Sequence, residues 1–362
     1  MRQVRAAGCK KAIDKKWGRV MRRMARPLLC GALALLACGP AQSQTIPQVS
    51  GNAALRALSA TQYPSVMRLG FAAAGDGGQA IYRPSSDACS FNGGNGDDGA
   101  QVRSADGKCW IADFGGMQVT PMVWGAKGDG AADDTAPVQA AINAVPALWL
   151  GDHLYRVAPL RAAKTLSIHG PSGTSGVYHP DCAHGLKVAS ATEDLLTLNG
   201  DGSVVERVCF QMGNAVNRQT AGAAITVAAA DGVVIKENQI NFPFKGVVVG
   251  GATDGVSQVN RHTQTNSTLV HSNVIVQPSN GGVGIEIGRM STGGSTVGTV
   301  LRDNSIACFG TSATGIAHYD SAGSFQNNPN GPYACNIGTS LTPEEPTPRI
   351  DSSLSWSQRA TY

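Results

Sequence analysis

Four long polar side chains follow one another through the second half of the chain at intervals of 30, 35 and 31 residues: Glu206, Lys236, His271 and Arg302. Each directly follows an aliphatic residue in a short apolar segment. A carboxylate, two cations and an imidazole are the groups that acid–base chemistry on a charged substrate uses. We therefore predict that these four residues are catalytic, provided that the segments carrying them are stacked in space.

Three kinds of chemistry are open to such a set. β-Elimination from a uronate needs a base at C5 and a cation that neutralises the carboxylate, and Lys236, His271 and Arg302 can supply these without a metal. Glycoside hydrolysis needs two carboxyl groups about 5–5.5 Å or about 6.5–9.5 Å apart, one of them protonated. No two of the acids near the repeats, Glu206, Glu237 and Asp303, occupy the same position in neighbouring segments. The third alternative is glycan binding or a structural role without turnover, and the polar residues could equally form solvated ion pairs that contribute little.

The segments that must position these residues form an internal repeat. Each reads apolar, two variable residues, a fourth residue that is Asn in three cases, one variable residue, then apolar: VERVCF (205–210), IKENQI (235–240), VHSNVI (270–275) and LRDNSI (301–306). A second apolar strand follows each: AAITV (223–227), GVVVG (246–250), GIEIG (284–288) and GIAHY (315–319). If the first strand alternates, the four polar residues face outward. We expect Asn238, Asn273 and Asn304 to stack as an internal ladder that satisfies buried backbone groups.

The stretch VTPMVWGAKGDGAADDTAPVQAAINAV (119–145) precedes these repeats and predicts a short apolar strand, a glycine-aspartate turn and an amphipathic helix. The apolar face of the helix consists of Val138, Ala141, Ile142 and Val145, at i, i+3, i+4 and i+7. Asp134 or Thr135 is expected to cap its first turn. Because so short a helix is unstable by itself, it must pack its apolar face on neighbouring structure.

The string GAKGDGAADDT within Trp124 to Ala144 resembles the opening motif of the pectate-lyase-like superfamily, which includes rhamnogalacturonase/epimerase-like proteins related to glycoside hydrolase family 28. The resemblance implies an all-β fold: a right-handed single-stranded parallel β-helix with an N-terminal capping helix. It also implies extracellular polysaccharide as the partner and glycosidase or lyase activity.

The paired aspartates and Arg-x-Lys element of the polygalacturonases are absent, as is the acidic cluster of the calcium-dependent pectate lyases. The alternative is therefore a non-catalytic glycan-binding or structural protein, tailspike-like or on the cell surface. We predict no cofactor and no metal site.

The first 43 residues have the pattern of a signal peptide, with translation beginning at Met1, Met21 or Met24. Ten basic residues precede Leu28, and the apolar run LLCGALALLAC, too short for a membrane span, follows. Removing residues 1–43 leaves 19 basic and 24 acidic residues, a net charge of −5. This charge disfavours a nucleic-acid partner. We expect a secreted or periplasmic protein, with lipid anchoring at Cys38 as the alternative.

Six cysteines remain after the leader, an even number typical of disulfides in an exported protein. Pairing neighbours in sequence predicts Cys89 with Cys109, Cys182 with Cys209, and Cys308 with Cys335. The predicted organisation is a signal peptide (1–43), a small disulfide-stapled β-module (44–114), the parallel β-helix (115–340) and a flexible tail (341–362). A monomer and a homotrimer both remain open.

Overall fold

The computed structural model describes residues 46–171, 181–228, 230–250, 264–288, 295–297, 299–307, 313–318 and 337–340. The predicted signal peptide, the lipid-anchor position Cys38, the Cys308–Cys335 pair and the tail at 341–362 lie outside these residues. None of the helices in the described residues has the length and apolar content that a membrane crossing requires.

The first described part is a five-stranded sheet with strand order β1-β2-β3-β5-β4, in which only β1 and β2 pair in parallel. Helix α1 (Asn52–Arg56) packs on this sheet over a core that includes Leu55, Tyr82 and Trp110. The predicted Cys89–Cys109 disulfide is confirmed. The strands are β1 (Gln48–Val49), β2 (Val66–Arg68), β3 (Ala80–Ser85), β4 (Gln101–Arg103) and β5 (Cys109–Asp113), with a 3-10 turn η1 (Asn92–Gly94) between β3 and β4.

A buried arginine ties this sheet to the segment that follows it. The guanidinium of Arg68, which is 0 % exposed, donates to the carbonyl oxygens of Gly78 at 3.0 Å, Asp98 at 2.8 Å and Val123 at 2.6 Å. It also lies over the ring of Tyr82, with 5.0 Å between the guanidinium carbon and the ring centroid. A fully buried cation is tolerated only when its donors are satisfied, so these partners hold the two segments in one arrangement.

The segment that resembles the superfamily motif differs from the expectation in two places. Pro121–Trp124 forms a 3-10 helix, η2, where we expected a strand, because proline at its first turn favours a helical start. The strand begins later, as β6 (Asp129–Asp133). Helix α2 (Thr135–Ala144) is present and contacts η2, β7, β8 and β9. Its role as a cap of the β-helix stays a prediction.

In this motif Asp134 holds the turn and does not cap the helix through its side chain, whereas Asp133 accepts a hydrogen bond from the backbone N–H of Thr135, the first residue of α2, at 3.0 Å. Asp134 stands at the N-cap without a side-chain capping bond. Its carboxylate accepts hydrogen bonds from the backbone N–H groups of Lys127 at 2.6 Å and Gly128 at 2.9 Å. Asp129 accepts from Ala131 and Ala132 at 2.8 and 2.7 Å. The predicted side-chain cap by Asp134 was therefore wrong, because the closing turn takes its oxygens.

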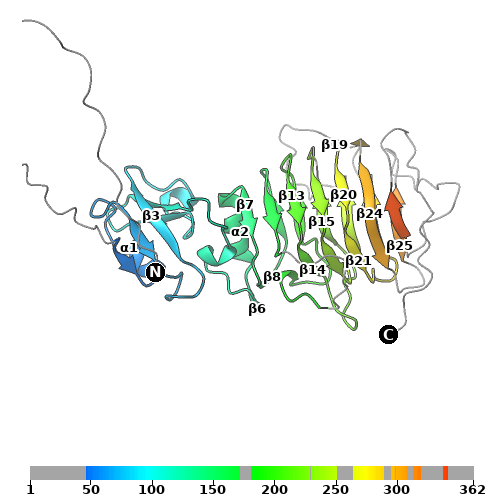
Figure 1. Cartoon of the computed structure of the whole chain (residues 1–362), viewed down its shortest axis with the longest axis horizontal. Helices are drawn as coiled ribbons and strands as arrows, with labels where there is room; N and C mark the ends of the chain where they lie inside the picture. The colour runs from blue at the N-terminus through cyan, green and yellow to red at the C-terminus, as the bar shows by residue number, and fades with distance from the viewer. Residues whose placement is uncertain are drawn as a thin grey trace, which may run out of the picture. The chain divides into compact units, whose positions relative to one another are not determined.

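The remainder is a right-handed parallel β-helix, whose coils follow one another along the chain in Figure 1. Each coil adds one strand to each of three parallel stacks. The first stack is β7 (Ala147–Trp149), β10 (Ser167–His169), β13 (Val204–Glu206), β16 (Val234–Lys236), β20 (Leu269–His271) and the start of β24 (Val300–Ala307). The second is β6, β8 (Leu154–Val157), β11 (Gly185–Val188), β14 (Cys209–Gln211), β17 (Gln239–Asn241), β21 (Val274–Val276) and the end of β24.

The third stack matches the second apolar strand of the repeat. It consists of β9 (Leu160–Ala162), β12 (Leu196–Leu198), β15 (Ala223–Val227), β18 (Lys245–Val249), β22 (Val283–Ile287) and β25 (Thr314–His318). Two further strands, β19 (Gln264–Asn266) and β23 (Ser295–Val297), pair with each other, and β26 (Ile337–Ser340) pairs antiparallel with β24. The predicted Cys182–Cys209 disulfide is confirmed.

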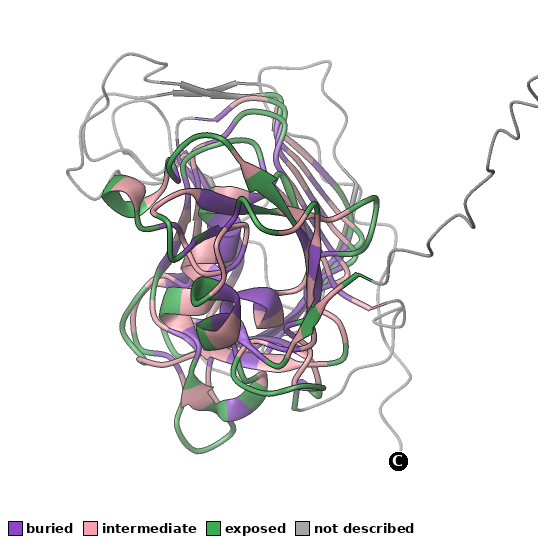
Figure 2. Cartoon of the chain, turned by 90° about the vertical axis from the view of Figure 1, so that its left-hand side faces the viewer, coloured by how far each residue is buried: buried purple, intermediate pink, exposed green. Residues whose placement is uncertain are grey.

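Inward-facing aliphatic side chains from all three stacks fill the interior, and Figure 2 shows the buried segments on the inside of the coils. In the first stack Ile168, Val205, Ile235, Val270 and Leu301 are each at most 1 % exposed. Because strand side chains alternate, the residues on either side of these five face outward.

The predicted asparagine ladder is confirmed. Asn238 Nδ2 donates to Asn273 Oδ1 at 3.0 Å, and Asn273 Nδ2 donates to Asn304 Oδ1 at 2.9 Å. Each amide also donates to a carbonyl of the preceding coil, namely that of Val205, Ile235 or Val270. All three asparagines are at most 1 % exposed. The ladder therefore satisfies the backbone groups that the bend removes from the strands.

Candidate functional site

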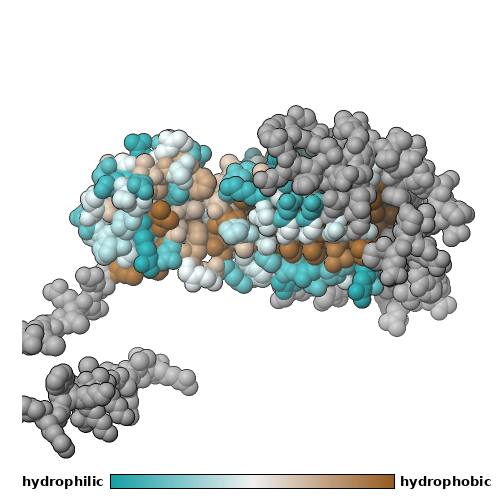
Figure 3. Space-filling view, turned by 90° about the horizontal axis from the view of Figure 1, so that it is seen from above, coloured by the Kyte–Doolittle hydropathy of each residue, from teal (hydrophilic) through white to brown (hydrophobic). Residues whose placement is uncertain are grey.

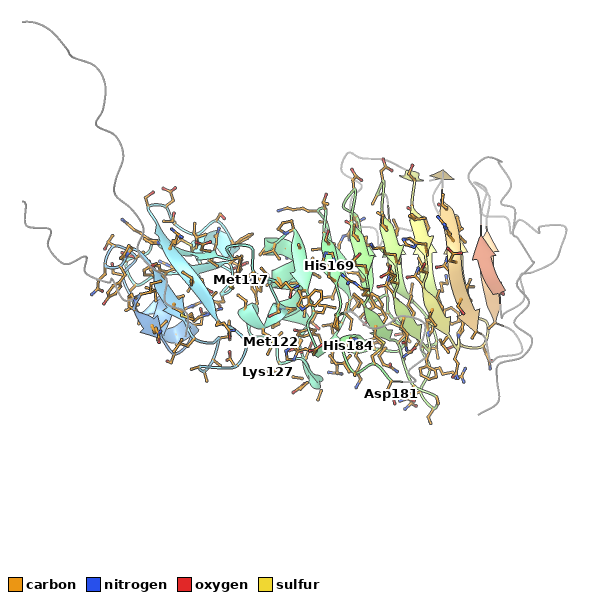
Figure 4. The ribbon with its side chains drawn as sticks, in the orientation of Figure 1. Met117, Met122, Lys127, His169, Asp181 and His184 are labelled. Atoms are coloured by element: carbon orange, nitrogen blue, oxygen red, sulfur yellow. A yellow bond between two sulfur atoms is a disulfide. The ribbon has the colours of Figure 1, made fainter. Side chains whose placement is uncertain are left out.

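The four predicted site residues lie in one row across neighbouring strands. Glu206 pairs in register with Lys236, Lys236 with His271, and His271 with Arg302. The row begins one coil earlier with His169, which pairs with Glu206 and is labelled in Figure 4. Parallel strands lie about 4.8 Å apart, so each side chain has its neighbours within reach. We call these five residues the charged row.

Glu206 lies at the centre of an ion-pair network and is 9 % exposed. Its carboxylate is 2.9 Å from His169 Nδ1, 2.7 Å from Arg207 Nη2 and 2.7 Å from Lys236 Nζ. Burial of the carboxyl acts to raise the pKa of Glu206, but the hydrogen bonds from Lys236, His169 and Arg207 outweigh it and lower the pKa to about 2. Glu206 is therefore ionised at neutral pH and holds Lys236 in place.

His271 occupies the row position between two cations. Its pKa is lowered from the ordinary value, first by desolvation and then by the positive charge of Lys236, against the opposing charge of Glu237. The imidazole is half-buried, and its Nδ1 lies 3.3 Å from the Ser272 hydroxyl. At neutral pH the ring is therefore uncharged and can accept a proton.

Arg302 ends the row and is more accessible. Its Nε donates to Asp303 at 3.1 Å, and the two side chains are 69 % and 62 % exposed. An ion pair so exposed contributes little free energy, so a ligand carboxylate can replace Asp303 at small cost. Of the cations flanking His271, Lys236 is fixed by Glu206 and Arg302 is available to a ligand.

The residues that follow the row make the bend between the first and second stacks. Arg207, Glu237, Ser272 and Asp303 all have left-handed backbone conformations, with φ between 51° and 57°. Glu237 and Asp303 lie two coils apart, and Ser272 occupies the coil between them. With Glu206 ionised and these two acids not adjacent, the arrangement lacks the protonated and ionised carboxyl pair that glycoside hydrolysis uses. Elimination fits the geometry better.

Sequence reasoning missed His169 as a member of the row. Its segment, SIHG, has neither the asparagine of the later repeats nor their spacing, since 37 residues separate His169 from Glu206. The available signal was the apolar residue followed by a polar one, as in the other four strands. Only the register of β10 with β13 identifies it.

Comparisons with known proteins agree with the architecture. No protein-family model and no curated protein matches the chain. Among solved structures, the enzymatically active domain of tailspike protein 2 from bacteriophage CBA120 matches with a TM-score of 0.52 at 19 % identity, over 76 % of this chain and 40 % of that one. Tailspike protein gp49 from Acinetobacter baumannii bacteriophage Fri1, a capsular polysaccharide depolymerase, matches with a TM-score of 0.54 at 13 % identity, over 79 % and 57 %.

These similarities agree with the class that the fold defines, a parallel β-helix protein. The outward charged row is a feature of this chain's own structure. The chain spans roughly half the length of the tailspike structures that it matches. The narrower assignment to the pectate-lyase-like superfamily stays a prediction.

Proposed function

We propose that the chain is an exported protein that cleaves an acidic extracellular polysaccharide by β-elimination at the charged row. The observation that carries this proposal is His271, an uncharged base in register with Lys236 on one side and Arg302 on the other. The polysaccharide chain runs across the strands, along the row, because the row itself runs from coil to coil.

The chemistry assigns one role to each group. His271 removes the proton at C5 of a uronate residue, the C–H electrons form the C4–C5 double bond, and the C4–O bond to the next sugar breaks. The leaving oxygen takes a proton from solvent. Arg302 neutralises the carboxylate and so makes the C5 proton more acidic. Lys236 adds positive charge on the other side of the base, and Glu206 is a positioning residue that holds Lys236.

The fold supports a polysaccharide ligand, since both tailspike structures share it and one is described as a capsular polysaccharide depolymerase. Export accords with the two disulfides. Soluble export and lipid anchoring at Cys38 both remain compatible with this function, as do a monomer and a homotrimer.

The second candidate is glycan binding without turnover. Its supporting observation is the charge balance of the charged row and the bend: Arg207, Lys236 and Arg302 are matched by Glu206, Glu237 and Asp303. A surface on which these charges balance can bind a polysaccharide through hydrogen bonds without catalysing its cleavage.

One experiment separates the two. The mature chain is incubated with a panel of acidic polysaccharides, and both reducing ends and the ultraviolet absorbance of unsaturated uronates are recorded. We expect unsaturated products, lost at least a hundredfold in His271→Ala and strongly reduced in Arg302→Ala. Arg156→Ala, which removes a half-buried arginine from β8 in the second stack, is the matched control and retains activity. Binding without products supports the second candidate, and undiminished products from His271→Ala refute the proposed role of this residue.

A further inference from the structure

A second row of side chains runs beside the charged row on the same outward face. It consists of Val204, Val234, Leu269 and Val300, which pair in register with one another across β13, β16, β20 and β24. Each lies two residues before a member of the charged row, and side chains two apart in a strand point to the same face. All four are half-buried. We call them the apolar row.

The apolar row is narrow and long. Its four members form one line that extends over four coils, about 14 Å at the usual strand spacing. Towards the N-terminus it ends at Ser167, the polar residue in register with Val204. Figure 3 shows a hydrophobic stripe between hydrophilic rows along the coils. Partly exposed aliphatic residues aligned in this way offer a ligand a line of apolar contact.

The shape of the apolar row and its position beside the charged row favour a linear polysaccharide over a protein partner. A stable protein interface covers about 800 Å² on each partner, with a wide apolar centre, and one line of side chains does not provide this. A linear polymer lying along the charged row covers both rows at once. The apolar row therefore faces one edge of the same polysaccharide whose carboxylates face Lys236 and Arg302.

The side chains of the apolar row determine which substituents the facing edge of the polysaccharide can carry. The aliphatic side chains offer no hydrogen-bond donor or acceptor, and the backbone groups of these strands are used in the parallel ladder. A sugar hydroxyl pressed against the row would lose its water without gaining a partner, which is unfavourable. A short acyl group would bury apolar surface there instead.

We propose that the apolar row is a subsite for O-acyl substituents, so that the ligand is an O-acetylated acidic polysaccharide. This inference rests on the proposed function, because it takes the polysaccharide to lie along the charged row. Val234 and Leu269, beside Lys236 and His271, determine the preference. Contact with one small apolar group changes relative affinity by about tenfold or more.

The test compares an O-acetylated polyuronate with the same polymer after de-O-acetylation, each titrated into the mature full-length chain. We expect the wild type to bind the acetylated polymer about tenfold more tightly. Val234→Thr adds a hydroxyl at nearly constant shape and Leu269→Ser shortens the row, and each reduces the ratio towards one because it weakens binding of the acetylated polymer most. The control is Val216→Thr, on a loop residue that is 88 % exposed and outside both rows.

Thermal melting checks that each variant is folded, and Val234→Thr, which retains a β-branched residue, is the variant expected to fold as the wild type does. Equal binding of the two polymers by the wild type, or an unchanged ratio in folded Val234→Thr, overturns the acyl subsite and leaves the charged-row function standing. Binding of neither polymer overturns both proposals.

Discussion

Replacing Glu206 with glutamine tests the network at the centre of the charged row. The pKa of Glu206 is about 2 in the folded protein, against an ordinary value of 4.5. This difference corresponds to about 3 kcal/mol of folding free energy, an order-of-magnitude figure, since each pKa unit corresponds to about 1.4 kcal/mol. The side chain is only 12 % exposed, so solvent screens the network weakly. We expect Glu206→Gln to lower the free energy of unfolding at pH 7 by about this amount.

The stability difference between wild type and Glu206→Gln should depend on pH in a definite direction. A carboxyl group with a lowered folded pKa stabilises the protein above its unfolded pKa, and this contribution is lost as pH falls through the folded value. Urea unfolding of wild type and Glu206→Gln, measured between pH 7 and pH 2.5, should therefore show a difference that is largest above about pH 5 and shrinks towards pH 2. Taking the difference between the two proteins removes the titration of all other acids.

The matched control is Glu193→Gln, because Glu193 is an exposed glutamate outside the charged row. Its effect should stay within about 0.5 kcal/mol at every pH, as for most surface substitutions. If Glu206→Gln and Glu193→Gln behave alike, or if the Glu206→Gln difference does not change with pH, then Lys236, His169 and Arg207 do not stabilise the Glu206 carboxylate in the way described.

Three further outcomes follow. Asn273→Ala should lower the free energy of unfolding by about 3 kcal/mol or more in urea titrations, because it removes the side-chain partner of the buried Asn238 backbone N–H and of the Ile235 carbonyl, and a loss below about 1 kcal/mol would contradict the ladder. Arg68→Met should cost about 3 kcal/mol or more by the same measurement, since the buried carbonyl oxygens of Gly78 and Val123 and the part-buried one of Asp98 lose their donor, and a neutral effect would show that the arginine does not join the two segments. For elimination, kcat/KM should decrease as the pH falls, with a midpoint below pH 6.5, because the pKa of His271 is lowered and the protonated ring cannot act as the base. A midpoint above pH 7 would argue for another base.

The β-helix could be predicted from the sequence because its signal is local and repeated. An apolar residue, a polar residue and an asparagine recur at one position per coil, so aligning the strings at Val205, Ile235, Val270 and Leu301 reproduces the register of the first stack. Alternation within the strand then places the charged row outside. The ladder follows from the same alignment, since a buried asparagine at a bend needs partners in the neighbouring coil.

Features that depend on long-range contacts could not be predicted in this way. Arginine is usually found at the protein surface, and only the packing of two segments shows that Arg68 is fully buried. Asp134 stands where a helix cap is expected, but a turn six or seven residues earlier takes its carboxylate. The pKa of Glu206 is lowered by hydrogen bonds from Lys236 and then from His169, whose segment lacks the repeat signal.

The most direct test of the account is a crystal structure of the mature chain carrying His271→Ala, bound to a uronic-acid oligosaccharide. We expect an oligosaccharide that crosses the strands of the first stack, with one carboxylate within hydrogen-bonding distance of the Arg302 guanidinium and C5 of that sugar facing position 271. An oligosaccharide bound on the second or third stack, with the charged row facing solvent, would contradict it.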